Sequence, residues 1–188
     1  LGSILAVIVV FWKRLFSLVG LYKIKDATPG SQLKLSHVIV GLIPAGVLGV
    51  LFEDFIDKHL FSVGTVLIGL VIGAFLMLAA DKFGPKKPKT QTLDQITYKQ
   101  AFTVGLVQCF SLWPGFSRSG ATISGGVLFG MSHRTAADFT FIMAVPIMFG
   151  ASFLSLLKNW NDINPNDMSF YAVGFISAFV FALISIKF

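Results

Sequence analysis

The sequence contains few charged residues. Asp, Glu, Lys and Arg make up only 13% of its 188 residues, whereas soluble domains carry about a quarter. Its single cysteine, Cys109, lies in an apolar segment, which excludes an internal disulfide and predicts a small buried side chain. Its three histidines show no metal-ligand spacing, so no metal site is predicted from them. The composition therefore argues against an ordinary soluble domain and against a disulfide-stapled one.

The uncharged stretches of the sequence are long and hydrophobic. A helix needs about 20 predominantly apolar residues to cross the hydrocarbon core of a bilayer. The chain has four runs of 18 to 22 residues without Asp, Glu, Lys or Arg, namely Leu35–Phe52, His59–Ala80, Phe139–Leu157 and Met168–Ile186. We therefore predict an all-α, polytopic membrane helical bundle rather than a soluble bundle with an apolar core. We also predict a first span from Leu1 to about Tyr22. Because the opening residues and the final FALISIKF look cut out of longer runs, we expect a fragment of a longer protein.

Loop charges predict the orientation of these spans. The segment from Lys13 to Lys34, which includes the turn signal TPGS at 28–31, has five Lys or Arg against one Asp. The segment Asp81–Lys99 again has five lysines, whereas the connection EDFIDK at 53–58 is acidic. Since cytoplasmic loops are enriched in Lys and Arg, the two basic segments are predicted to be cytoplasmic and 53–58 external. The net charge of +6 is thus attributed to membrane topology, and no nucleic-acid partner is expected.

Two short apolar pieces interrupt the series of full-length spans. AFTVGLVQCFSLW (101–113) and ATISGGVLFGM (121–131) flank the string PGFSRSG. Segments of about 10 to 14 apolar residues are more often re-entrant or buried than spanning, and the Pro-Gly pair would break a continuous helix. We therefore predict a re-entrant helical hairpin over about 101–131. Its irregular tip is a candidate site, because non-helical backbone at membrane depth needs protein or water around it. The alternative is an ordinary span through 101–117, which would invert the orientation of the later spans.

The predicted tip carries a charge in an otherwise uncharged stretch. Arg118 is the one Asp, Glu, Lys or Arg between Lys99 and Arg134, and an ionisable residue inside a membrane is by default a functional hypothesis. One interpretation is a structural salt bridge to Asp138. The other is an anion site, because a permanently charged, planar guanidinium suits phosphate oxygens.

The neighbours of Arg118 favour the anion site. The second half-helix begins near Arg118, so its unpaired N–H groups and positive dipole end point at the tip. A helix that starts by Arg118 places Thr122 on the same face. Gly115 and Gly120 let backbone N–H groups approach a ligand. Side-chain hydroxyls are supplied by Ser117, Ser119, Thr122 and Ser124.

Three known phosphate motifs are absent from the sequence. There is no G-x-x-x-x-G-K-[ST], which excludes a nucleotide P-loop. Cys109 lies too far before Arg118 for the signature of a cysteine-dependent phosphatase. Ser124 stands where the membrane acid-phosphatase type of lipid phosphatase has a histidine after its arginine. The tip therefore matches none of these three classes.

The tip does resemble one enzyme family. PGFSRSGATISGG, with the preceding QAFTVGLVQCFSLW, is similar to the bacterial undecaprenyl-diphosphate phosphatase family of the bacitracin-resistance type. The likeness extends to LGSILAVIVVFWKRL, LIPAGVLGVLF, ITYKQAF, FTFIMAVPIMFGAS and FYAVGFISAFVFALISIK. The resemblance therefore covers nearly the whole chain.

This resemblance implies a multi-pass enzyme of the bacterial inner membrane that hydrolyses undecaprenyl diphosphate to undecaprenyl phosphate and phosphate, recycling the carrier lipid for peptidoglycan. It implies an inverted-topology repeat whose halves each bear a re-entrant hairpin, a site facing the periplasm, and a divalent cation, Mg²⁺ or Ca²⁺. The single integral-membrane domain 1–188 would then comprise the remainder of the first repeat (1–80), a basic cytoplasmic loop (81–99) and the second repeat (100–188). A homodimer is a further expectation.

The resemblance also implies roles for residues of the tip. By match to the motif, Arg118 would bind and stabilise the diphosphate, while Ser117 and Thr122 would hydrogen-bond it. These three are the expected catalytic residues. Ser119 and Gly120 complete the expected substrate-binding set.

One motif of the family has no counterpart in this sequence. It carries two glutamates, serines and a histidine on the first hairpin, and the resemblance assigns the metal and the nucleophile or general base to it. No metal ligand is therefore expected in this chain, and the 188-residue piece by itself is expected to be inactive; the family's final span is also missing. Two alternatives stay open. One is a phosphate-recognising lipid flippase or transporter that does not hydrolyse its substrate, and the other is a structural membrane subunit with the Arg118–Asp138 bridge.

Overall fold

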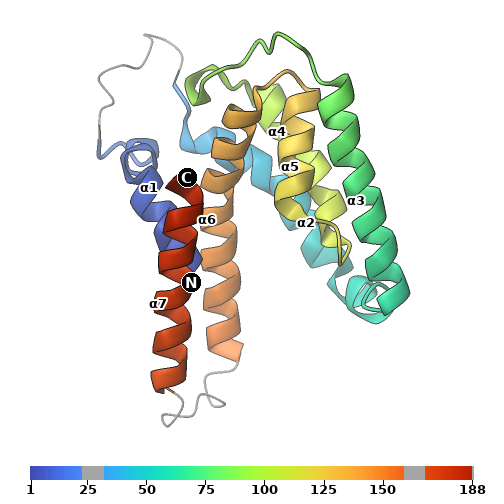
Figure 1. Ribbon diagram of the computed structural model, residues 1–188, viewed down its shortest axis with the longest axis vertical. Helices are drawn as coiled ribbons and strands as arrows, with labels where there is room; N and C mark the ends of the chain where they lie inside the picture. Colours follow the sequence, from blue (N-terminus) through green and yellow to red (C-terminus); the bar gives the residue numbers. More distant parts are fainter. Residues whose placement is uncertain (23–31, 159–167, 188) are drawn as a thin grey trace. The chain divides into compact units, whose positions relative to one another are not determined.

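The computed structural model describes residues 1–22, 32–158 and 168–187. Over these residues the chain is built of helices, which confirms the all-α prediction (Figure 1). The long helices are α1 (Gly2–Leu18), α2 (Leu35–His59), α3 (Val63–Phe83), α6 (His133–Lys158) and α7 (Met168–Lys187). The shorter elements are the 3-10 turns η1 (Leu93–Gln95) and η2 (Cys109–Leu112) and the helices α4 (Tyr98–Gln108) and α5 (Arg118–Leu128).

Among the described residues, four helices are long and apolar enough to cross a membrane. They are Leu35–Phe52, Val63–Phe83, His133–Leu157 and Met168–Ile186, and each overlaps one of the predicted hydrophobic runs. Many of their large apolar side chains are exposed, as those of Val71, Phe75 and Phe181 show. Such exposure would be costly in water but not in lipid, so the chain is a polytopic membrane protein.

Some predicted boundaries differ from the structure. The acidic string at 53–58 is not a connection, because α2 continues through it to His59. Helix α3 starts at Val63, where the Ser62 hydroxyl accepts a hydrogen bond from the N–H of Thr65 at 3.3 Å and so caps the first turn. The predicted first span, Leu1 to about Tyr22, corresponds to α1, a helix of 17 residues with non-helical dihedral angles at Phe11 that is not among these four candidate spans. The turn predicted at 28–31 lies outside the described residues.

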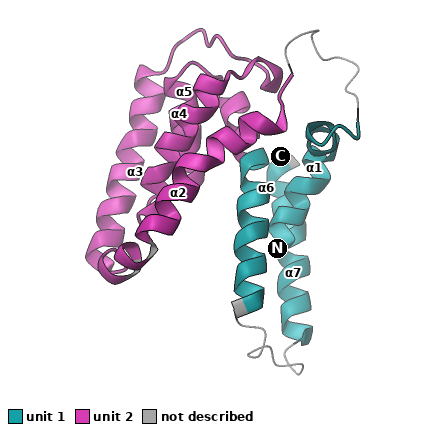
Figure 2. Cartoon of the chain, turned by 180° about the vertical axis from the view of Figure 1, so that it is seen from behind, with its two compact units in different colours: residues 1–25, 141–188 teal, residues 26–140 magenta. Residues whose placement is uncertain are grey.

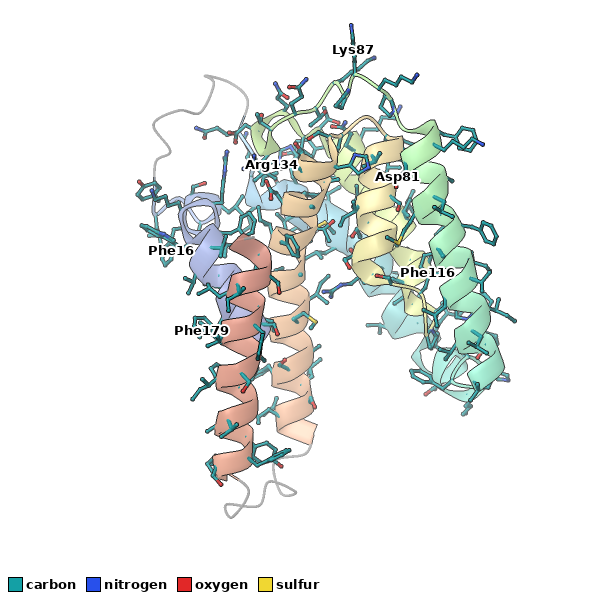
Figure 3. The ribbon with its side chains drawn as sticks, in the orientation of Figure 1. Phe16, Asp81, Lys87, Phe116, Arg134 and Phe179 are labelled. Carbon is teal, nitrogen blue, oxygen red and sulfur yellow. The ribbon has the colours of Figure 1, made fainter. Side chains whose placement is uncertain are left out.

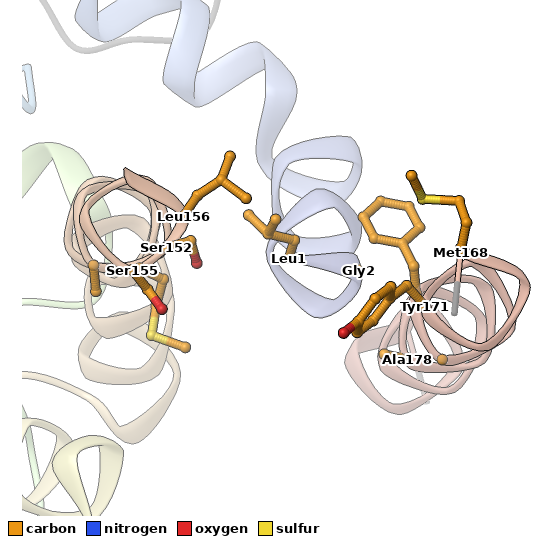
Figure 4. A pocket seen from close by; sticks show the side chains of 12 residues that line it. Leu1, Gly2, Ser152, Ser155, Leu156, Met168, Tyr171 and Ala178 are labelled. Atoms are coloured by element: carbon orange, nitrogen blue, oxygen red, sulfur yellow. The ribbon is translucent and has the colours of Figure 1, made fainter. Parts of the chain in front are cut away.

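The chain divides into two compact units, residues 1–25 with 141–188 and residues 26–140 (Figure 2). In the first unit, Gly2 of α1 lies against the backbone carbonyl of Phe175 in α7, where a Cβ would collide. A glycine therefore permits close approach of these two helices. Helices α1, α6 and α7 also line an apolar pocket of about 1050 Å³, whose lining includes Ser152 and Tyr171 (Figure 4).

In the second unit, α2 packs on α4 and α3 packs on α5. Gly105 of α4 lies against the carbonyl of Gly41 in α2, and a side chain there would collide with it. On the other side, the Cβ position of Gly69 in α3 lies 2.7 Å from the carbonyl oxygen of Pro114. Small residues thus hold the segment from α4 to α5 tightly between α2 and α3.

The basic segment between α3 and α4 is fixed at its middle. The N–H of Thr90 donates to the carbonyl of Gly130 at 3.1 Å, and the N–H of Ser132 donates to the carbonyl of Thr90 at 2.8 Å. Its lysines stay exposed, and Lys87 points away from the helices (Figure 3). The segment is therefore tied to the end of α5 while its charges remain accessible.

Candidate functional site

The predicted hairpin is present as two short helices. Helices α4 and α5 lie side by side, and the chain between them passes through η2 and an irregular tip, residues 113–117 (Figure 1). Helix α4 ends at Gln108, and the 3-10 turn η2 carries the chain to Leu112. Regular structure thus stops just before the Pro114–Gly115 pair at which the sequence predicted the break. The entry of this hairpin into a membrane stays a prediction.

The tip is anchored to α3. The indole Nε1–H of Trp113 donates to the backbone carbonyl of Thr65 at 2.9 Å. Gly115 has φ +91°, a conformation that side chains other than glycine rarely adopt, and a Cβ there would collide with the carbonyl of Val66. The irregular backbone is therefore held in one conformation by α3, which fixes the start of α5.

Two hydroxyls meet at that start. Ser117 is the N-cap of α5, and its hydroxyl accepts a hydrogen bond from the N–H of Gly120 at 3.1 Å. The Ser117 and Ser119 hydroxyl oxygens lie 3.4 Å apart, and both residues are exposed. Because the first N–H groups of a helix carry partial positive charge and lack intrahelical partners, the two hydroxyls extend a surface that suits an anion.

Arg118 follows directly as the first residue of α5 and is half-buried. Within the part of the chain that the structure describes, no ion pair joins its guanidinium to the carboxylate of Asp138. The structural salt bridge considered from the sequence is therefore not observed. The guanidinium therefore has no ion pair with Asp138 that would stop it from binding an anion at the start of α5.

Thr122 faces the protein interior rather than the tip surface. It is 2% exposed, and its hydroxyl donates to the carbonyl oxygens of Arg118 at 2.9 Å and Ser119 at 3.2 Å. The same hydroxyl oxygen accepts a hydrogen bond from the hydroxyl of Thr140 in α6 at 2.9 Å. Thr122 thus positions the first turn of α5, and in this structure its hydroxyl is fully engaged.

Replacing Thr122 by Val is expected to destabilise the protein by about 1 kcal/mol, because the hydroxyl of Thr140 loses its acceptor while the side-chain volume is kept. The wild type is the reference, because Thr122→Ser would retain the hydroxyl but lose a buried methyl group. Thermal unfolding of the detergent-solubilised full-length protein measures the effect. A melting temperature of Thr122→Val equal to that of the wild type would contradict the positioning role.

A groove runs between α3 and α5. Its volume is about 200 Å³. Ser117 and Ser119 line it at the tip end, and Asp81 and His133 line it at the loop end. In Figure 3, Phe116 marks the tip end and Asp81 the loop end of these helices. We call this feature the α3–α5 groove.

Three contacts at this site were not predictable from sequence patterns. The carboxylate of Asp81 and the Nε2 of His133 lie 2.9 Å apart although 52 residues separate them in the chain. The Trp113–Thr65 and Thr140–Thr122 hydrogen bonds span 48 and 18 residues. No local spacing signals such pairs, since each depends on how separate helices pack.

The donor set of the tip suits a phosphate group better than a divalent cation. Its side chains are hydroxyls and a guanidinium, whereas Mg²⁺ and Ca²⁺ select carboxylate and carbonyl oxygens. Over the described residues there is no group of three or more His, Cys, Asp or Glu side chains that could hold a metal ion. The tip by itself therefore does not fit the divalent cation that the family resemblance implies.

Comparisons with known proteins identify the family of the chain. The family model for "Bacitracin resistance protein BacA" matches residues 1–188. The chain is 72% identical to an undecaprenyl-diphosphatase of Exiguobacterium sibiricum, with 100% of this chain and 69% of the relative covered. It is 71% identical to one of Geobacillus sp. strain WCH70 (100% and 68% covered). It is also 60% identical to one of Bacillus subtilis strain 168 (100% and 69% covered). Since the match includes the hairpin, its tip and all the spans, the chain belongs to the bacitracin resistance protein family BacA.

Proposed function

We propose that this protein hydrolyses undecaprenyl diphosphate to undecaprenyl phosphate and inorganic phosphate, and that the tip of the α4–α5 hairpin binds the diphosphate. The family assignment and the shared name of the relatives support the reaction. The observation that carries the location of the site is the start of α5, where Arg118 is the first helical residue and the Ser117 and Ser119 hydroxyl oxygens lie 3.4 Å apart. A guanidinium, two hydroxyls and a helix N-terminus are complementary to phosphate oxygens.

Each residue of the candidate site has a distinct role in this proposal. Arg118 donates two parallel hydrogen bonds to phosphate oxygens and offsets the charge that develops on the transferred phosphoryl group. Ser117 and Ser119 donate their exposed hydroxyls to the same group. Gly120 keeps the backbone close to the ligand, and Thr122 holds the first turn of α5 in place through its hydrogen bonds to Arg118 and from Thr140.

The tip stabilises charge but supplies no acid or base. Residues 113–120 contain no carboxylate and no imidazole. General acid–base chemistry and the attacking group are therefore proposed to come from a second motif, which the family resemblance places on another hairpin with its glutamates and histidine. A divalent cation, if used, would bind there. The contribution of this chain is then to bind the diphosphate, orient it and neutralise it.

The membrane orientation is inferred from the charges of the loops. The lysines of the segment 81–99 are exposed, and we propose that they face the cytoplasm of a bacterial inner membrane. The tip lies at the opposite end of α5 from that segment. A ligand would therefore reach Arg118 from the periplasmic side, and the polyisoprenoid chain of the lipid would stay in the bilayer.

Release of phosphate from undecaprenyl diphosphate by the purified full-length protein tests the function. We expect Ser117→Ala to lower kcat/KM about 10-fold, because a hydrogen bond to a charged phosphate is lost. Ser62→Ala is the matched control, since it removes the N-cap of α3 but lies outside the tip and should leave kcat/KM unchanged.

Two outcomes would count against this proposal. Binding of the lipid diphosphate without phosphate release would favour a transporter or flippase. An equal effect of Ser117→Ala and Ser62→Ala would show that the loss of a helix cap, and not of a ligand contact, is responsible.

A further inference from the structure

Ser124 lies in the middle of the α3–α5 groove with an unused hydroxyl. Its side chain lines the groove and is only 3% exposed. Across the residues that the structure describes, it makes no hydrogen bond, and no fully enclosed side-chain oxygen there lacks a partner. The Ser124 hydroxyl must therefore open into the groove. Because a nearly buried hydroxyl without a partner is unfavourable, the groove needs an occupant that can hydrogen-bond.

The geometry of α5 leaves space for that occupant. Ser117, Gly120 and Ser124 are spaced by three and four residues, so they share one face of the helix. Gly120 has no side chain to fill the space between the two hydroxyls, and its Cβ position lies 3.0 Å from the sulfur of Met77 in α3. A larger residue at 120 would therefore narrow the groove between the tip and Ser124.

The walls of the groove restrict what it can bind. Ala80 and Val127 are apolar and 2% and 3% exposed. Beyond the tip, Asp81 contributes a carboxylate and none of the groove's lining residues is a Lys or Arg, so an anion would be repelled from the loop end of the groove. An apolar chain would leave the Ser124 hydroxyl unsatisfied. Water is small, both donates and accepts, and satisfies buried polar groups of this kind.

We propose that the α3–α5 groove binds a chain of water molecules connecting the tip hydroxyls of Ser117 and Ser119 with the Asp81–His133 pair. A volume of about 200 Å³ has room for several waters, since each occupies about 30 Å³ in the liquid. Ser124 anchors the middle of the chain, and the polar groups at both ends terminate it. The biological consequence rests on the proposed function: the water chain supplies water from within the protein to the tip, where hydrolysis consumes it.

Hydroxyl-radical labelling of the wild-type full-length protein in detergent tests this proposal, because radicals made from bound water modify the side chains next to it. Val127 lines the groove and is 3% exposed, whereas Phe139 is 0% exposed and does not line it. We expect Val127 to be labelled at least about five times faster than Phe139, although an aromatic ring is intrinsically the more reactive. Equally slow labelling of both residues would overturn the proposal.

A variant adds a second measurement. Ser124→Val places two methyl groups where the hydroxyl opens into the groove, and it should lower the labelling of Val127 to the level of Phe139. Unchanged labelling of Val127 in this variant would overturn the role of Ser124. Labelling needs no substrate, so it is independent of activity. Hydrolysis of undecaprenyl diphosphate without labelling of the groove would overturn only the water-chain proposal. A labelled groove in a protein that does not hydrolyse undecaprenyl diphosphate overturns only the proposed function.

Discussion

Arg118→Lys is expected to reduce kcat/KM for undecaprenyl diphosphate hydrolysis by about 100-fold or more. Loss of one preorganised donor to a transition-state oxyanion commonly costs that much, and an ammonium cannot reproduce the bidentate fork of a guanidinium. Arg118 is half-buried in the first turn of α5, so its position is set by the helix rather than by a flexible loop. The measurement is phosphate release from the lipid diphosphate by the purified full-length protein.

Arg134→Lys is the matched control for this prediction. Arg134 is exposed in the first turn of α6, away from the tip, and its replacement should leave kcat/KM within about twofold of the wild type, as is usual for exposed positions. Near-normal hydrolysis by the Arg118→Lys variant would show that Arg118 does not act in the site. A melting temperature close to that of the wild type would show that the lost activity does not come from unfolding.

Gly115→Ala is expected to destabilise the hairpin tip and abolish most of the activity. Gly115 has φ +91°, which costs a residue with a Cβ about 1–2 kcal/mol. The new Cβ would also collide with the carbonyl of Val66 in α3, and overpacking of this kind typically costs about 1–3 kcal/mol. Since the tip positions the start of α5, its displacement from α3 would move Arg118 and Ser117 together. Thermal unfolding and phosphate release on the same preparation measure both effects.

Gly46→Ala separates this effect from that of a generic glycine substitution. Gly46 lies inside α2, and no heavy atom outside the local helix lies within 4 Å of its Cβ position. Alanine is the better helix former, so this variant should be as stable as the wild type or more stable. Equal melting temperatures for the Gly115→Ala and Gly46→Ala proteins would show that the tip does not need glycine.

Much of the fold could be predicted because membrane helices are determined locally. The length of an uncharged run decides whether a helix can cross the bilayer, and the four predicted runs overlap four helices of the structure. The Pro-Gly pair fixed the break between α4 and α5 for the same reason, since proline and glycine act on the backbone at their own position. Where the prediction failed, as at 53–58, charge had been taken as a loop signal although a helix can continue through acidic residues.

The candidate site could be predicted in composition but not in detail. Ser117, Arg118 and Ser119 are consecutive, so any helix that starts at Arg118 places all three at its first turn. The orientation of Thr122 could not be predicted. Its spacing from Arg118 predicted that the two share a face of the helix, but the spacing could not show that the Thr122 hydroxyl is buried and bonded to Thr140 in α6.

The sequence by itself therefore determined that this protein crosses a membrane, where its hairpin breaks and which residues stand at the break. These properties depend on hydrophobic length, backbone preference and immediate neighbours. Only the tertiary structure decided that α3 holds the tip through Thr65 and Val66, that Thr122 faces inward, and that Ser124 opens into a groove ending at Asp81 and His133. Those contacts join helices far apart in the chain, and packing between helices has no signature in the spacing of residues along one of them.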